Sequence, residues 1–417
     1  MKNLVSSQMA SLEERVINTM LARIRVRRGV PFNLHHDVRL HSSVGRAPVR
    51  LREALFSDFK DVTELKRRCG LLPDSLQNWE RLWRHNPALQ QGSFERPIGW
   101  VLEVEGRLVG YLGNISLSYY YGDRALTAVT GAGFAVEPAY RAVSLSLVAA
   151  FYRQRSVDLY LTTTAIEAVG KIARAFKSDP LPQTDYETVL FWVLQPYPFT
   201  KAVMKKLKLS PTLSHVGGML TSLLLGTDTI VRRRWPSRGS ASLPVSEIGV
   251  DQIGDDFQGL WMEKLKETPR LLADRSPAAL RWHFEIPTDA GTARVLCCRD
   301  NGDLLGYAAI LSDQDQATGL RRSMVADMLV KQDDPAILRA LLIAAYNHAK
   351  RVGSHVLEVL GFPYSIRQVC SQWNSYRRKY PACPFYYKAA DPTLHKTFSD
   401  GSAWYATPFD GDTTLMF

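Results

Sequence analysis

The sequence predicts an α/β protein of two similar domains, each a mixed, mostly antiparallel sheet flanked by helices, and three observations support this. The chain has 417 residues, more than one hydrophobic core usually serves. Apolar residues make up 46% and charged residues 22%, the proportions of a soluble globular protein. The order of strand-like and helix-like patterns in the first half returns in the second half, although the sequence itself does not repeat.

Residues 1–48 are predicted to form a basic N-terminal extension that contains a helix. Ser11 and Glu14 have the spacing of a capping box, and the apolar residues around them recur on one helical face. Lys2 and seven arginines against three acidic residues give 8 − 3 = +5 of the net charge of +11. We expect the apolar stripe to dock this helix on the protein; contact of its arginines with a membrane or nucleic acid is the alternative.

Residues 49–210 are predicted to form the first α/β domain. Alternating apolar and polar residues at its start indicate a half-buried strand, and Glu105-Gly106 suits a hairpin turn. In order, the patterns predict a strand at 49–54, helices at 56–69 and 76–85, hairpin strands at 99–104 and 107–115, a strand at 125–136, a helix after 144, a strand at 157–163, a helix at 165–176 and a strand at 188–194.

The segment between the strand at 125–136 and the next helix has the character of an anion-binding turn. The apolar run ends at Glu137-Pro138, since proline has no N–H and cannot continue a central strand. Arg141 then lies in the turn that opens the helix, where unpaired backbone N–H groups favour an anion. An ordinary strand, turn and helix with a surface arginine is the alternative.

Strand, V-x-P-x-Y-R turn and helix together resemble the pyrophosphate loop of the GNAT superfamily of acyl-CoA-dependent N-acyltransferases, written Q/R-x-x-G-x-G/A. Arg141 matches the first position of that loop, while Ser144 and Ser146 replace its glycines and permit a less close approach of the backbone to a ligand. We expect Ser144 to cap the helix with its hydroxyl. The resemblance implies that acetyl-CoA or another acyl-CoA is the co-substrate and is bound by Ala135, Val136, Arg141, Ala142, Val143, Ser144, Leu145 and Ser146.

Residues 211–243 are predicted to be a linker between the domains. Arg232-Arg233-Arg234 and the proline, serine and glycine that follow are typical of an exposed turn. A contact between these arginines and nucleic acid is the alternative.

Residues 244–417 are predicted to form the second domain, with a hairpin turn at Asn301-Gly302 and a long helix from Pro335. The order of elements in both domains resembles the GNAT fold, in the tandem arrangement of mycothiol synthase, N-myristoyltransferase and the Fem-type transferases. Asp333 and Asp334 stand where this domain would need a pyrophosphate loop, and they would repel a diphosphate. We therefore expect the second domain to serve the acceptor.

No catalytic residue follows from the resemblance, because the positions that GNAT enzymes usually use for a carboxylate and a tyrosine hold neither. Three substitutes are predicted. Tyr121 ends a tyrosine cluster before a strand, and Asp327 and Glu358 lie in apolar strands, where an unpaired carboxylate is costly to bury. The alternatives are packing for the tyrosine, and buried ion pairs with Arg281 or His283 for the carboxylates.

The C-terminal residues 404–412 carry Asp410 and Asp412 around a glycine. These acids either reach a cleft between the domains or belong to a surface turn, which we take as the default. Five cysteines without a C-x-x-C pair indicate neither a zinc site nor a disulfide framework, so we expect no metal and a cytoplasmic protein.

The sequence therefore predicts an enzyme that transfers an acyl group from acyl-CoA to an amine, or less readily to a hydroxyl, of a small molecule or saccharide. An acyl carrier protein or an aminoacyl-tRNA as donor is compatible with the basic charge. A non-catalytic protein that binds acyl-CoA or a partner is the remaining alternative, because the usual catalytic positions are empty.

Overall fold

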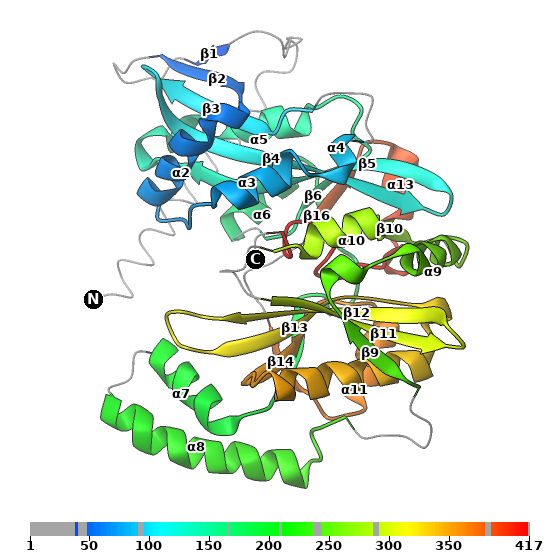
Figure 1. The fold of residues 1–417 in the computed structure, drawn as a ribbon. Coiled ribbons are helices and arrows are strands. Elements are labelled where there is room, and N and C mark those ends of the chain that lie inside the picture. Colours follow the sequence, from blue (N-terminus) through cyan, green and yellow to red (C-terminus); the bar gives the residue numbers. More distant parts are fainter. Residues whose placement is uncertain are drawn as a thin grey trace. The chain divides into compact units, whose positions relative to one another are not determined.

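The computed structural model describes residues 38–40, 48–90, 96–164, 167–207, 211–236, 243–286, 292–379 and 385–415 (Figure 1). The chain forms two compact units that are interleaved in sequence. Unit 1 comprises Met1–Ser118, Leu126–Leu181 and Ala382–Lys396, and unit 2 comprises Tyr119–Ala125, Pro182–Pro381 and Thr397–Phe417. The helix predicted near Ser11 lies outside the described residues; of residues 1–47, the structure describes β1 (Val38–Leu40).

Unit 1 is built on a mixed sheet in the strand order β1-β2-β3-β4-β5-β6-β16-β7. Its strands after β1 are β2 (Val49–Glu53), β3 (Gly99–Val104), β4 (Arg107–Tyr121), β5 (Arg124–Val136), β6 (Leu159–Thr162), β7 (Asp179–Pro180) and β16 (Tyr386–Ala389). β5 and β6 run parallel, whereas β2, β3 and β4 pair antiparallel in that order. The β3–β4 hairpin turns at Glu105 and Gly106, with φ of 49° and 79°, which confirms the predicted turn.

Helices cover both faces of the unit 1 sheet. They are α2 (Phe59–Arg68), α3 (Leu76–Trp83), α4 (Pro87–Gln90), α5 (Leu145–Tyr152) and α6 (Glu167–Ala175). The ring of Trp79 in α3 lies 6.2 Å from that of Tyr111, so α3 is on the face that carries Tyr111. Leu112 points to the opposite face because successive strand residues alternate, and there it shares a core with Leu147 and Phe151 of α5.

Unit 2 contains a second mixed sheet in the order β15-β8-β14-β13-β12-β11-β9. Its strands are β8 (Thr188–Val193), β9 (Val245–Ile248), β11 (Thr292–Asp300), β12 (Asp303–Gln314), β13 (Arg321–Val330), β14 (Val356–Val359) and β15 (Tyr376–Lys379), and β10 (Leu271–Ala273) pairs with the end of β4. Its helices include α9 (Asp255–Leu265), α10 (Pro277–Phe284), α11 (Pro335–Arg351) and α12 (Tyr364–Ser371), whereas α13 (Pro392–Thr397) belongs to unit 1 except for its last residue. Two mixed sheets flanked by helices confirm the predicted fold class.

Each sheet contains a strand from the other half of the sequence. β8 falls within the predicted first domain, 49–210, yet it pairs with β14 in the sheet of unit 2. β16 comes from the second half, and it lies between β6 and β7 in the sheet of unit 1. The compact units therefore cross the predicted boundaries, because an apolar pattern identifies a strand without showing which sheet edge it joins.

The predicted linker 211–243 is largely helical, so this prediction is wrong. α7 (Pro196–Lys206) and α8 (Pro211–Val231) pack side by side (Figure 1). The arginines and turn residues that indicated a linker begin at Arg232, after α8 has ended. In the described part of the chain, no helix is both long and apolar enough to cross a membrane.

Candidate functional site

Strands β5 and β6 separate at one point and leave a cavity between them. They pair in parallel as far as Thr130 and Leu161. The next residues, Gly131 of β5 and Thr162 of β6, both line a cavity of about 860 Å³. Its apolar walls include Leu112, Leu145, Val148, Phe151, Val169 and Ile172.

A bulge at Gly133 interrupts β5 beside this cavity. A Cβ added to Gly131 would lie 3.5 Å from Leu112, whereas a Cβ added to Gly133 would lie 2.9 Å from Lys66 Nζ and 3.5 Å from Tyr111. Residues two apart in a regular strand face the same side, so the opposite directions of these glycines mark a local irregularity. Gly133 has a φ of 63°, the left-handed conformation that glycine adopts without strain.

The edge of β5 beyond Thr130 presents backbone groups to the cavity. The Glu137 N–H donates to the Val109 carbonyl on the β4 side, 3.0 Å away. Successive residues of a strand direct their N–H groups to opposite edges, so those of Phe134 and Val136 point to the cavity side. In the described residues β6 does not pair with this part of β5, and these groups are therefore available to a ligand.

The turn after β5 and the start of α5 form one end of the cavity. A 3₁₀ segment spans Pro138–Val143, and α5 begins at Leu145. Six of the eight predicted ligand-binding residues line the cavity: Ala135, Val136, Arg141, Ala142, Ser144 and Leu145. Val143 and Ser146 are not among its lining residues.

The two serines that replace glycines bind the turn itself. Ser144 Oγ donates to the Arg141 carbonyl at 2.7 Å, and Ser146 Oγ donates to the Val143 carbonyl at 2.6 Å. Ser144 makes no side-chain cap of α5, so its predicted capping role is wrong. Both hydroxyls satisfy carbonyls of the tight turn instead, which holds the turn in shape, so that backbone N–H groups and Arg141 are the groups here that could bind an anion.

Charge at this end of the cavity is positive. Glu137 accepts from Arg68 Nε at 2.8 Å and from Arg107 Nη2 at 2.6 Å. Arg141 lines the cavity four residues after Glu137 and adds a further positive charge, and this excess suits a diphosphate. Cys69 also lines the cavity, but burial and the Glu137 carboxylate raise the pKa of its thiol, which disfavours the nucleophilic thiolate.

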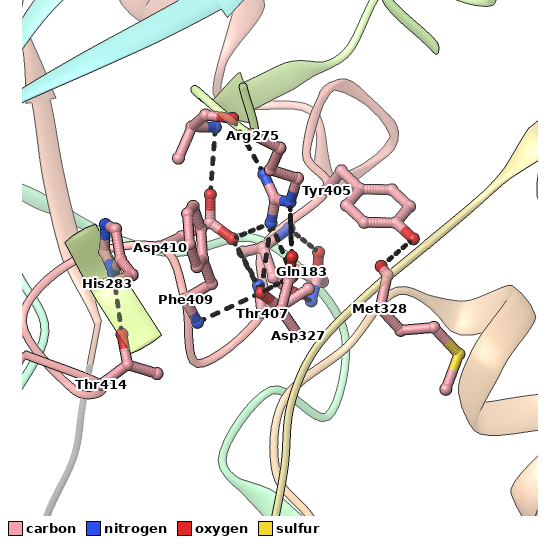
Figure 2. Close-up of polar contacts among 12 residues, drawn as sticks. Gln183, Arg275, His283, Asp327, Met328, Tyr405, Thr407, Phe409, Asp410 and Thr414 are labelled. Carbon is pink, nitrogen blue, oxygen red and sulfur yellow. Dashed lines mark hydrogen bonds and ion pairs between the residues drawn. The ribbon is translucent and has the colours of Figure 1, made fainter. Parts of the chain in front are cut away.

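Asp327 belongs to a buried network in unit 2 (Figure 2). Its carboxylate accepts from Arg275 Nε and Nη2, each at 3.0 Å, from the Tyr307 hydroxyl at 2.7 Å and from Thr407 Oγ1 at 2.8 Å. Arg275 Nη2 also donates to Asp410 at 2.9 Å. Asp327 and Arg275 are fully buried. A carboxylate so completely engaged favours the structural interpretation that the sequence left open.

The partners predicted for the two strand carboxylates are wrong. Glu358 accepts from Arg378 Nη2 at 2.7 Å, so each carboxylate has an arginine that the sequence did not indicate. Arg281 Nη1 donates to a backbone carbonyl, and His283 Nδ1 lies 3.0 Å from Thr414 Oγ1. Arg275 and Arg378 are distant in sequence from the acids they bind, and a local sequence pattern does not predict such pairs.

Two further candidates, Tyr121 and the acids of residues 404–412, are packed among other side chains of the protein. Tyr121 pairs with Leu271 of β10, and its ring meets that of Phe398 edge-on at 5.4 Å, which favours packing. Residues 404–412 are buried in unit 2, so the predicted surface turn is wrong. Burial raises the pKa of the Asp410 carboxyl, and the positive charge of Arg275 opposes this increase.

Among the residues that the structure describes, no group of three His, Cys, Asp or Glu could hold a metal ion.

No protein-family model and no curated protein sequence matches the chain. Solved structures do match it. A GCN5-related N-acetyltransferase from Anabaena variabilis aligns with a TM-score of 0.52 and 11% identity, over 82% of this chain and 73% of that one. N-myristoyltransferase from Saccharomyces cerevisiae aligns with a TM-score of 0.52 and 13% identity, over 84% and 82% of the two chains. The chain has the GNAT fold. A probable N-acyltransferase from Enterococcus faecalis gives a TM-score of 0.52 at 8% identity, over 82% and 72%.

Within the GNAT fold of unit 1, a buried lysine that sequence reasoning missed lies beneath the bulge. Lys66 of α2 forms an ion pair with Asp74, and its Nζ lies 5.7 Å from the centre of the Tyr111 ring. The lysine is almost entirely buried. The signal was present in the sequence: Lys66 follows Val62 by four residues and therefore occupies the apolar face of α2, where a charged side chain needs a partner.

Proposed function

We propose that the protein is an acyltransferase that moves an acyl group from acyl-CoA to an amine. One observation carries the proposal: the cavity opens where β5 and β6 separate, and it ends at the arginine-bearing turn before α5. One site thus combines an apolar wall, an open strand edge and a positive end. These are complementary to the acyl chain, the amide-rich pantetheine arm and the diphosphate of acyl-CoA, respectively.

The open edge of β5 supplies the donor side of the reaction. Its N–H groups at Phe134 and Val136 would bind the pantetheine arm and polarise the thioester carbonyl. The amine nitrogen then attacks the carbonyl carbon and the carbon–sulfur bond breaks. The leaving thiolate takes up a proton, and the amine loses one to water or to a carboxylate.

Lys66 is a positioning residue in this scheme, because it lies beneath the bulge rather than in the cavity lining, and Asp74 acts through its ion pair with Lys66. Lys66→Met is expected to lower kcat about tenfold through displacement of the bulge, with the acyl-CoA Kd nearly unchanged. Stopped-flow thiol release and calorimetry measure the two quantities. The exposed Lys60→Met on the same helix is the control and should retain wild-type kcat. Equal loss of kcat and binding would contradict a positioning role.

Arg141→Glu is expected to weaken CoA binding about tenfold at low salt, or about 1.4 kcal/mol, because it reverses a charge at the diphosphate end. Calorimetry at low and high salt should show the difference shrinking as salt rises. Arg124→Glu, at the opposite end of β5, is the matched control. An unchanged affinity of the Arg141 variant would mean that the diphosphate lies elsewhere.

The proposal as a whole is tested by binding and turnover. Calorimetry with CoA, acetyl-CoA and longer acyl-CoAs is expected to show binding to unit 1, and thiol release across a panel of amines is expected to show turnover. Binding without release by any amine would favour a non-catalytic acyl-CoA-binding protein. Binding to an acyl carrier protein or aminoacyl-tRNA in place of every CoA compound would overturn the choice of donor. We further propose that unit 2 binds the acceptor.

A further inference from the structure

Helix α8 exposes apolar side chains on one side. The exposed residues are Met219, Leu223, Leu224, Ile230 and Val231, and four of them are about 70% exposed: Leu223 at 68%, Leu224 at 71%, Ile230 at 69% and Val231 at 74%. At 3.6 residues per turn, all five fall within about 140° of the helix circumference. A surface helix usually shows the reverse pattern, with polar residues on its outer face.

Another side of α8 holds the polar contacts. Asp228 forms ion pairs with Arg232 at 2.8 Å and Arg234 at 2.6 Å, and it accepts from the Tyr376 hydroxyl at 2.7 Å. Asp228 lies about 110° from the middle of the apolar face and about 40° beyond Leu224 at its edge. The polar contacts therefore lie beside the apolar face, and the five apolar side chains are left to solvent.

The α7–α8 segment is strongly basic. Residues 196–236 contain Lys201, Lys205, Lys206, Lys208 and three arginines against Asp228 alone, a net charge of 7 − 1 = +6. Lys201, Lys205, Lys206, Arg232 and Arg233 are exposed. Positive charge thus lies at the end of α7 and directly after α8, on either side of the apolar face in sequence.

We propose that the apolar face of α8 binds the interfacial region of a membrane that contains anionic lipid. An apolar face buried among acyl chains, with lysines and arginines at the level of phosphates, matches this arrangement. The charge disfavours two other occupants. A second copy of the chain would place its own charge of +6 against the +6 of this segment. Residues 1–37 are also positive, with six basic against three acidic side chains, a net of +3, and would be repelled.

Vesicle flotation with the full-length protein tests the proposal. Vesicles of phosphatidylglycerol and phosphatidylcholine are expected to bind the protein at least about tenfold more tightly than phosphatidylcholine alone, and high salt should reduce this difference. The double variant Leu223→Glu, Leu224→Glu should lose most of the binding. Leu72→Glu changes a leucine that is 91% exposed in unit 1 and should bind as the wild type does.

Several results would overturn the proposal. The first is no vesicle binding by the wild type, and the second is equal binding by the double variant once circular dichroism shows both to be folded. Sedimentation is the third measurement: a wild-type dimer that the double variant converts to a monomer would assign the face to a second copy of the chain. A monomer that binds anionic vesicles through the two leucines supports the membrane.

Discussion

Replacement of Arg275 by methionine is expected to lower the free energy of unfolding by about 3–5 kcal/mol, the largest loss of stability we predict for a single side chain. The guanidinium lies between Asp327 and Asp410, and the variant leaves both carboxylates buried without their cation. Urea unfolding followed by circular dichroism measures the change. The matched control is Arg67→Met, since the Arg67–Glu64 pair is more than half exposed and should contribute less than about 1 kcal/mol.

Variants of the same network distinguish a structural role of Asp327 from a catalytic one. If the network is structural, removing all three charges with apolar residues should recover part of the stability that the single variant loses, because no unpaired charge remains buried. The variant for this is Arg275→Met, Asp327→Leu, Asp410→Leu. If Asp327 were catalytic, Asp327→Asn would lose turnover while keeping the wild-type midpoint of unfolding. A stable but inactive Asp327→Asn protein would therefore refute the structural assignment.

Replacement of Gly131 by leucine is expected to weaken acyl-CoA binding about a hundredfold while the protein stays folded. A Cβ at this position has ordinary contacts of 3.5 Å to Leu112 and 3.9 Å to Phe151, so the backbone tolerates a side chain. The remaining atoms of leucine occupy the cavity that the ligand needs, and overpacking of about 1–3 kcal/mol corresponds to up to about two orders of magnitude in Kd. Calorimetry with acetyl-CoA measures the loss.

The control for this variant is the same substitution outside the cavity. Gly259 lies on the exposed side of α9, where an added Cβ meets nothing within 4 Å. Gly259→Leu should bind acyl-CoA as the wild type does. Gly131→Ala should give an intermediate Kd, since it adds one carbon. Wild-type binding by a folded Gly131→Leu protein would place the acyl-CoA outside this cavity.

The turn between β5 and α5 could be predicted from the sequence, because it depends on the properties of neighbouring residues. Proline at 138 ends β5 for the same reason in any context, and an arginine three residues later must lie near the opening of α5. The sequence therefore located Arg141 and most of the residues that line one end of the cavity. It could not show that Ser144 and Ser146 turn their hydroxyls to carbonyls, because a serine at a helix start has several partners within reach.

Contacts between distant segments were beyond reach of the sequence. Lys66 meets Gly133 only because α2 packs on the face to which the bulge turns, and Arg275 meets Asp327 across 52 residues. The bulge itself depends on one glycine among several in a small-residue strand. Periodicity predicts which face of an element is apolar, but it does not say which element covers that face.

The position of β16 sets the order in which the protein can be completed during translation. The ribosome makes β6 more than 200 residues before it makes β16, the strand that covers the far edge of β6. Until then a nascent unit 1 exposes an unpaired strand edge, the kind of template that promotes aggregation. A gene truncated before residue 382 would leave that edge permanently open. Folding of unit 1 can therefore finish only after residues 182–381 of unit 2 have been made, and a stop before β16 harms the unit whose synthesis began first.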